Sequence, residues 1–314
     1  MLSTVRLHWP EYLIEAAGLG LFMIAAAVFG VLLEHPDSAV RQLIASGFVR
    51  RGLMGVAMGF TAVGIVYSRW GRQSGAHLNP AVTLAFFRLG KVRGPDAVFY
   101  GVAQFLGGAV GLGAAALALG PWLGHPAVRY VVTVPGPAGA WAAGAAELGI
   151  AFGLMGAVLL ASNSTRFARL TGLFAGALVA LYITVEAPIS GMSMNPARTL
   201  ASALPAREWT ALWVYFVGPP LGMLLAAEAY RRLCGLQAVR CAKLDHGGAR
   251  RCIFRCGYAP QGAADRAHPA RARAAMTPGM TAASIDRSID VSARVLGFEP
   301  TPDVAVTAPQ VVAP

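Results

Sequence analysis

The residues best suited to chemistry lie in an eleven-residue motif that occurs twice. Ser74–Leu84 and Ser190–Leu200 share Ser, Gly, Asn, Pro, Ala, Thr and Leu at matching positions. The central triplets are Asn79, Pro80 and Ala81, and Asn195, Pro196 and Ala197. Asn is a strong helix N-cap, and Pro is favoured at the first helical position because its missing N–H would have no partner there. Each motif therefore predicts a loop that leads into a helix and carries an Asn amide as hydrogen-bond donor.

Four further polar residues lie in or beside apolar segments. Glu15 and Glu147 occupy equivalent places in the two halves of the chain. Charged groups inside spans are costly and are usually functional. We interpret each carboxylate as an acceptor for the irregular loop of its own half. Gln104 is a second brace or a plain hydrogen bond between helices, and His77, the one candidate for enzyme chemistry in the spans, is interpreted as a loop brace.

The elements that must position these residues are apolar segments. The chain of 314 residues is 56% hydrophobic and 13% charged, which is a poor match to a soluble domain. A membrane span needs about 20 mostly apolar residues. Six segments meet this need: Tyr12–Leu33, Gly52–Ser68, Ala97–Leu119, Trp141–Ala161, Leu170–Ala187 and Trp209–Arg231. Glycines four residues apart predict close helix contacts at Gly107 and Gly111, Gly149 and Gly153, and Gly172 and Gly176.

The spans form two halves, at about residues 10–120 and 140–233. Three spans per half is an odd number, so the second half is inserted upside down relative to the first, and such repeats place their site near the midplane. The apolar stretch after each Asn (80–90 and 196–204) is about ten residues, or roughly 15 Å, which is half of a hydrocarbon core of about 30 Å. Irregular backbone at that depth is tolerated where it is buried or lines a watery cavity. We therefore predict an all-α membrane protein with six transmembrane helices and two half-helices around a pore.

The net charge of +11 comes from basic residues spread over loops and tail without a recognition motif, so we expect no nucleic-acid partner. Loops on the side of the N-terminus carry more Lys and Arg than the opposite loops, although Arg50 and Arg51 oppose this trend. The positive-inside rule then predicts a multi-pass protein of the plasma or inner membrane with both termini in the cytoplasm.

Over residues 10–233 the chain resembles the major intrinsic protein family, the aquaporins and aquaglyceroporins. The resemblance rests on the two triplets, the spacing of six spans, Glu15, Glu147, Gln104 and Arg198. It implies a channel domain over residues 1–233 that conducts passively, is not an enzyme, needs no cofactor and forms a homotetramer with one pore per subunit.

The chemistry of the residues agrees with such a channel. A water between the Asn79 and Asn195 amides must turn its oxygen to both donors, which interrupts the chain of hydrogen bonds that a proton would need. The half-helix N-termini carry partial positive charge and repel cations. Arg198 follows Asn195 by one helical turn, where the first half has Val82, and supplies donors and a positive charge to an otherwise apolar channel.

By family spacing, the constriction around Arg198 includes Ile183, Met192 and either Met58 or Gly59. Strict water channels of the family have a His in place of Ile183 and a Phe in the second span. The filter is thus more apolar and in that respect similar to the plant nodulin-26-like members.

Other residues favour water. Glycerol facilitators of the family have Asp in place of Thr199 and a Pro-aliphatic pair in place of Tyr215-Phe216. We expect a water channel that also passes small neutral solutes; the alternative is a glycerol or metalloid-acid facilitator. A secondary transporter would need titratable groups along the path, and Glu15 and Glu147 are already assigned to the loops.

Composition changes after residue 233. The tail, residues 234–314, is basic and contains all four cysteines, and from Ala259 onward it is typical of disorder. Cys241, His246, Cys252 and Cys256 are spaced like zinc ligands; the competing interpretation is a reduced basic segment on anionic lipid. We expect deletion of the tail to leave permeability unchanged.

Overall fold

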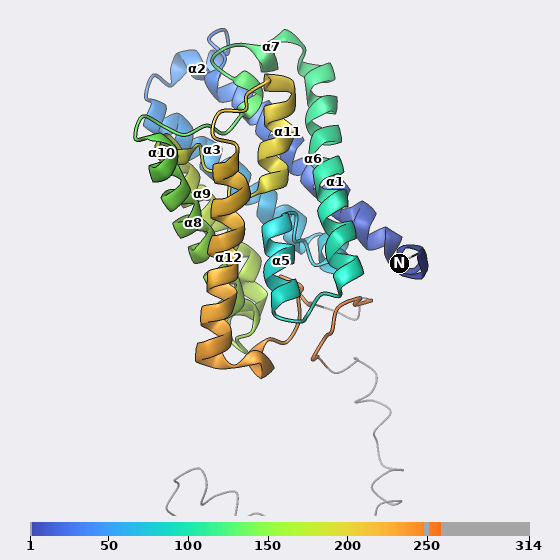
Figure 1. Ribbon diagram of the computed structural model, residues 1–314. Helices are drawn as coiled ribbons and strands as arrows, with labels where there is room; N and C mark the ends of the chain where they lie inside the picture. The colour runs from blue at the N-terminus through green and yellow to red at the C-terminus, as the bar shows by residue number, and fades with distance from the viewer. Residues whose placement is uncertain (1, 248–250, 259–314) are drawn as a thin grey trace, which may run out of the picture. The chain divides into compact units, whose positions relative to one another are not determined.

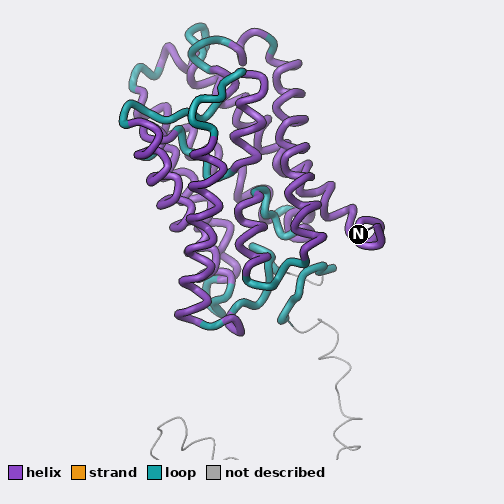
Figure 2. Tube along the Cα trace, in the orientation of Figure 1, coloured by secondary structure: helices purple, strands orange, loops and turns teal. Residues whose placement is uncertain are grey.

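The computed structural model describes residues 2–247 and 251–258. The expected disorder from Ala259 onward falls outside the described residues. The described part is built from helices and connecting loops, as Figures 1 and 2 show, and the residues through Tyr258 form one compact unit. The all-helical fold class is therefore confirmed.

Six long helices match the six expected spans. They are α1 (Leu2–Glu34), α3 (Gly47–Tyr67), α6 (Gly94–Leu119), α8 (Gly139–Ser162), α9 (Thr171–Val185) and α12 (Trp213–Cys234). The first five of these are long and apolar enough to cross a membrane. α12 carries Pro219, Pro220 and Glu228 along its length, which lowers its apolar character.

Two shorter helices, α5 (Pro80–Arg88) and α11 (Pro196–Ala206), begin at the Pro of each triplet. They lie one above the other between α6 and α12 (Figure 1). The other described elements are α2 (Ala39–Leu43), α4 (Arg69–Ser74), α7 (Pro121–Gly124), α10 (Ala187–Ser190) and the 3-10 turns η1 (Arg129–Val131), η2 (Ala168–Leu170) and η3 (Leu236–Ala238).

The helix pairings show the inverted repeat. In order along the chain, α1, α3 and α6 correspond to α8, α9 and α12. The most extensive contacts are α1 with α6, its counterpart α8 with α12, and α3 with α9 across the two halves. Each half-helix packs on the last long helix of the other half, α5 on α12 and α11 on α6. The two halves are therefore interlocked.

Glycines allow the long helices to approach closely. A Cβ on Gly107 would overlap the Ala16 carbonyl oxygen of α1, and one on Gly176 would lie 2.7 Å from the Gly59 carbonyl oxygen. The expectation for Gly149 is wrong, because that residue has open space around it. The α8–α12 contact uses Gly222 of α12 instead, whose added Cβ would overlap the backbone of α8.

The channel helices end at Cys234, one residue after the boundary expected at 233. Residues 235–247 and 251–258 nevertheless pack against one end of the bundle rather than leaving it. We call this end the tail side and the opposite end the far side.

Candidate pore and its tail-side mouth

A cavity of about 330 Å³ lies within the unit and is lined by residues from both of its ends. On the far side its lining includes Glu34 and Arg51; at mid-depth it includes Asn79 and Asn195; on the tail side it includes Leu244. Most of the other side chains that line the cavity are aliphatic or thioether groups. The cavity therefore has the position and character of a narrow transmembrane path.

The two Asn side chains hold the half-helices end to end. The side-chain oxygen of Asn79 accepts from the backbone N–H two residues later at 2.8 Å, and that of Asn195 does the same at 3.1 Å. The Asn79 amide donates to the Met194 carbonyl at 2.7 Å, and the Asn195 amide donates to the Leu78 carbonyl at 2.8 Å. Each loop thus caps its own helix and is tied to the other loop. Because an amide NH2 has two hydrogens, each Asn keeps a second donor for the cavity that it lines.

The loop backbones are held in an uncommon conformation. Residues at matching places in both loops have positive φ, a region that costs a non-Gly residue about 1 kcal/mol or more. They are Gly75, Ala76 and Leu78 in the first loop and Gly191, Met192 and Met194 in the second. Loops that carry such strain must be held by their surroundings.

Glu15 is the main support of the first loop. Its Oε1 accepts from the Ser74 hydroxyl at 2.7 Å and from the His77 N–H at 3.1 Å. Its Oε2 accepts from the Leu78 N–H at 2.6 Å and from the Gln104 amide at 2.8 Å. The carboxylate is fully buried, so these four donors take the place of water.

Glu147 repeats the arrangement in the second loop. Its Oε1 accepts from the Ser190 hydroxyl and the Ser193 N–H, both at 2.7 Å, and its Oε2 accepts from the Met194 N–H at 2.7 Å. The three donors occupy the positions of the corresponding donors in the first motif. Two buried carboxylates therefore hold two equivalent loops in the same way.

Two tyrosines complete the support, and sequence reasoning missed this role. The Tyr100 hydroxyl donates to the Ser74 carbonyl at 2.7 Å, and the Tyr215 hydroxyl donates to the Ser190 carbonyl at 2.5 Å. Both tyrosines are fully buried. The signal was present in the repeat, since Tyr100 follows Ser74 by 26 residues and Tyr215 follows Ser190 by 25.

Arg198 lies one turn into α11 and lines the cavity. Its Nη1 is buried and has no hydrogen-bond partner among the described residues. The next residue, Thr199, is tied instead to Thr133 at 2.9 Å and to Ser193 at 2.5 Å. A buried guanidinium N–H without a protein acceptor can donate to a solute in the cavity.

Three of the four expected filter residues line the same cavity as this Arg. Ile183, Met192 and Met58 all line the cavity. Gly59, the alternative to Met58, is not among the lining residues; it packs on α9, where an added Cβ would lie 2.6 Å from the Gly176 carbonyl oxygen. The expected filter residues that line the cavity are therefore apolar except for the guanidinium.

His77 connects the first loop to the tail. Its Nδ1 lies 3.0 Å from the Thr83 hydroxyl oxygen, and its Nε2 donates to the Ala242 carbonyl at 2.8 Å. The imidazole stacks on Phe254 with ring centroids 5.4 Å apart. Leu244 also reaches the loop, since its N–H donates to the Gly75 carbonyl at 3.2 Å. The tail thus occupies the tail-side mouth of the cavity.

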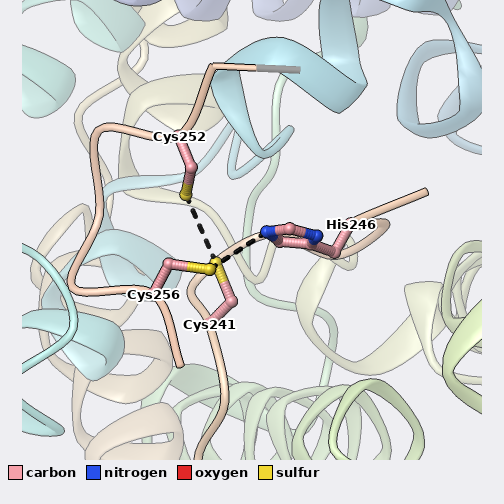
Figure 3. A group of neighbouring side chains, drawn as sticks. All are labelled: Cys241, His246, Cys252 and Cys256. Carbon is pink, nitrogen blue, oxygen red and sulfur yellow. Dashed lines mark hydrogen bonds between the residues drawn. The ribbon is translucent and has the colours of Figure 1, made fainter. Parts of the chain in front are cut away.

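Four side chains of the tail converge beside this mouth (Figure 3). The Cys241 and Cys252 sulfurs are 3.6 Å apart, and the His246 Nε2 lies 3.0 Å from the Cys256 sulfur. The ligand atoms of all four lie within 4.8 Å of one another. A hydrogen bond with Cys241 lowers the pKa of the Cys252 thiol.

The sequence pattern of the family described as "Major intrinsic protein" matches residues 1–230. The chain belongs to this family. It is a multi-pass integral membrane channel protein and not an enzyme.

Several plant members of the family are similar to the chain. It is 35% identical over 230 residues to Aquaporin NIP2-3 of Zea mays, covering 72% of this chain and 74% of that one. It is 38% identical over 176 residues to Aquaporin NIP2-2 of Zea mays and 40% identical over 170 residues to Aquaporin NIP6-1 of Arabidopsis thaliana. The matched region spans 58% and 54% of those two relatives, less than two thirds of their length.

A solved structure has the same fold. The X-ray structure of the aquaglyceroporin from Plasmodium falciparum matches with a TM-score of 0.60 at 18% identity, over 74% of this chain and 98% of that one. At this identity the likeness supports the aquaporin fold of the chain, which the family match shows independently.

Proposed function

We propose that this member of the major intrinsic protein family conducts water through the cavity between Asn79 and Asn195. The observation that carries the proposal is the pairing of the two Asn amides at the meeting point of α5 and α11, each with one hydrogen committed to the opposite loop. The remaining hydrogens offer two adjacent donors to a water oxygen. A water held there turns its own hydrogens away, so a continuous proton wire is broken.

Cations are excluded by charge in this proposal. The N-termini of both half-helices meet at the Asn pair and present partial positive charge to the cavity. Arg198 adds a full charge on the same cavity, and its buried Nη1 has no hydrogen-bond partner in the part of the chain that the structure describes. A neutral solute with an acceptor oxygen is stabilised by the same donors that oppose a cation.

A second permeant class is favoured by the filter walls. Ile183, Met192 and Met58, which line the same cavity as Arg198, are all apolar. A small neutral solute with apolar surface, such as glycerol or an undissociated metalloid acid, enters such a filter at a lower free-energy cost. A filter with a second hydrogen-bonding residue would raise that cost. We therefore propose passage of small neutral solutes in addition to water.

Stopped-flow light scattering on proteoliposomes tests both proposals. We expect shrinkage in an impermeant osmolyte to be faster than that of empty liposomes for the full-length chain, and faster again for Leu244→Ala, in which the side chain at the mouth is reduced. Re-swelling in glycerol decides whether the apolar filter admits it. If neither protein exceeds empty liposomes in any osmolyte, the proposed channel function is wrong.

Arg198→Val gives the matched test of ion exclusion, since Val82 occupies the equivalent position in the first half. We expect proton and cation leak to rise severalfold because the charge is removed, while water flux persists. The measurement is dye-reported pH equilibration in the same proteoliposomes, with Arg207→Val on the loop after α11 as control. Unchanged ion leak in the Arg198 variant would refute the role of this residue.

We propose a homotetramer with one pore per subunit, on the family resemblance. Native mass spectrometry is expected to give four times the 32.7 kDa of one chain. A monomer under conditions that retain flux would contradict this assembly.

We also propose that the tail side faces the cytoplasm. Arg72, Arg88 and Lys91, which lie in the loops and half-helix on that side, support this orientation through the positive-inside rule. Cys234 is exposed there, so a membrane-impermeant maleimide should label it in inside-out vesicles and not in intact cells. The reverse labelling pattern would overturn the orientation.

A further inference from the structure

The four converging side chains of the tail form a set that the pore does not use. Cys241 and His246 flank one short loop, and Cys252 and Cys256 flank another. Their ligand atoms come within 4.8 Å of one another although the two loops are separate in sequence. Figure 3 shows all four side chains turned toward a common centre.

The spacing of these atoms fits one tetrahedral metal ion. With metal–sulfur bonds of about 2.3 Å, two thiolates at the corners of a tetrahedron are about 3.8 Å apart. The Cys241 and Cys252 sulfurs are 3.6 Å apart. Three sulfurs and one imidazole nitrogen form a donor set of structural zinc sites, and soft thiolates disfavour Mg²⁺ and Ca²⁺.

The segment also has little regular structure of its own. Within 239–247 and 251–258 the structure describes bends and irregular backbone without a helix or strand. Its own backbone bonds are few, such as Gly257 N–H to the Arg240 carbonyl at 2.7 Å. In short segments of this kind the free energy of metal binding supplies the free energy of folding.

The two loops that lie between the four ligand residues both contact the tail-side mouth of the cavity. The first carries Ala242, whose carbonyl accepts from His77, and Leu244, which lines the cavity. The second carries Phe254, which stacks on the same imidazole. A metal ion that joins the two loops would therefore set the position of every tail group that touches the pore.

An ion pair and a backbone hydrogen bond around the rim add to this contact. Arg72 donates to Asp245 at 2.7 Å, and the Arg255 N–H donates to the Lys91 carbonyl at 2.9 Å. Asp245 lies directly before the ligand His246, so the rim contact and the cluster share one stretch of backbone. The docked segment is thus continuous from the cluster to the cavity.

We propose that Cys241, His246, Cys252 and Cys256 bind one Zn²⁺, and that this ion holds residues 239–247 and 251–258 as a cap in the tail-side mouth with Leu244 in the path. The capping part rests on the proposed channel function; the metal site does not. The proposal replaces our expectation that the tail has no effect on permeability, because Leu244 lines the cavity.

Metal binding is tested on the purified full-length chain without any transport assay. Co²⁺ added to reduced, metal-free protein should give the visible absorption of a tetrahedral site and a sulfur-to-cobalt charge-transfer band, both removed by one equivalent of Zn²⁺. Cys252→Ser and Cys256→Ser should weaken binding by more than the about 10–100-fold typical of an outer-shell change. Cys234→Ser is the matched control, because Cys234 is exposed and outside the cluster.

Two outcomes overturn the site. If wild-type protein with reduced thiols gives no tetrahedral cobalt spectrum, the metal site is absent. Equal cobalt binding by wild type, Cys252→Ser and Cys256→Ser would place the metal elsewhere.

The cap is tested by stopped-flow water flux of the same proteins in proteoliposomes. Zinc-loaded wild type and Cys234→Ser should conduct slowly and gain severalfold when a membrane-permeant zinc chelator is added. Cys252→Ser and Cys256→Ser should conduct at the higher rate with or without chelator. Flux that is indifferent to chelator and variant overturns the cap, and absence of flux from every protein overturns the channel while the cobalt spectrum still decides the metal site.

Discussion

At the scale of single residues, Glu15 and Glu147 do for the two loops what water would do outside a membrane. Each buried carboxylate gathers a Ser hydroxyl and two backbone N–H groups of its own motif. These loops contain residues at positive φ, so without the acceptors the loop would lose both its hydrogen bonds and its shape. The Asn geometry at the centre of the pore therefore depends on carboxylates that do not line it.

Glu147→Gln is the corresponding test. The variant has nearly the same shape but exchanges one acceptor oxygen for an NH2, which cannot accept from Ser193 or Met194. One buried backbone N–H is left without a partner, and we expect the free energy of unfolding to fall by about 1–3 kcal/mol. Thermal or denaturant unfolding in detergent measures the loss.

The control is Glu208→Gln, which alters an exposed ion pair with Arg129 of the kind worth about 0–1 kcal/mol. An equally small effect of Glu147→Gln would show that the second loop holds its shape without this carboxylate.

At the scale of helices, the six spans and both half-helices could be predicted because long apolar runs and Asn-Pro starts are local signals. The predicted ends of these helices were less accurate than the predicted existence of the helices. The second span was expected from Gly52, but α3 begins at Gly47 because Arg50, which looks like a boundary, is buried in a pair with Glu34 and in hydrogen bonds to nearby carbonyls. The ion pair with Glu34 allows the charged Arg50 to lie inside a helix rather than at its end.

The site was predictable to a similar degree. The triplets, both carboxylates and Arg198 lie in repeated or family-like motifs, so their sequence positions are sufficient to locate them. The choice between Met58 and Gly59 could not be made from the sequence, because the face that a helix residue presents depends on the neighbouring helix, here α9. The contacts of His77 with the tail depend on residues more than 160 positions away, and no local pattern predicts them.

Helix packing can be tested on α6, where two glycines two residues apart face different surroundings. An added Cβ at Gly111 would overlap the Gly20 carbonyl of α1, whereas one at Gly113 would meet nothing within 4 Å. We expect Gly111→Ala to destabilise the protein by about 1–3 kcal/mol through overpacking.

Gly113→Ala, the matched control, should be neutral or slightly stabilising because Ala favours a helix over Gly. Unfolding in detergent compares the two. Equal stability of both variants would mean that α1 and α6 can separate without cost.

At the scale of the whole molecule, the halves complete each other. α5 packs on α12, α11 packs on α6, and each Asn amide donates to a carbonyl of the opposite loop. The connection between the halves passes through exposed Pro137 and Ala138 before α8. The covalent link is thus far less extensive than the contacts that join the halves.

A chain cut between Pro137 and Ala138 should therefore still assemble. We expect residues 1–137 and 138–314 to co-purify when they are expressed together, and each to be unstable when expressed alone, since its half-helix would lack its partner. An affinity tag on one fragment and recovery of the other measure assembly. Stable accumulation of either fragment alone would contradict the interlock.

The exchange of half-helices also bears on ancestry. Two identical copies of a half-length chain, inserted into the membrane in opposite orientations, would fill each other's gap in the way that α5 and α11 do. A single short gene would have sufficed to make a pore if its product inserted into the bilayer in both orientations. Duplication and fusion across the stretch between η1 and α8 would then have freed each half to diverge, so that Val82 and Arg198 could become different from one another.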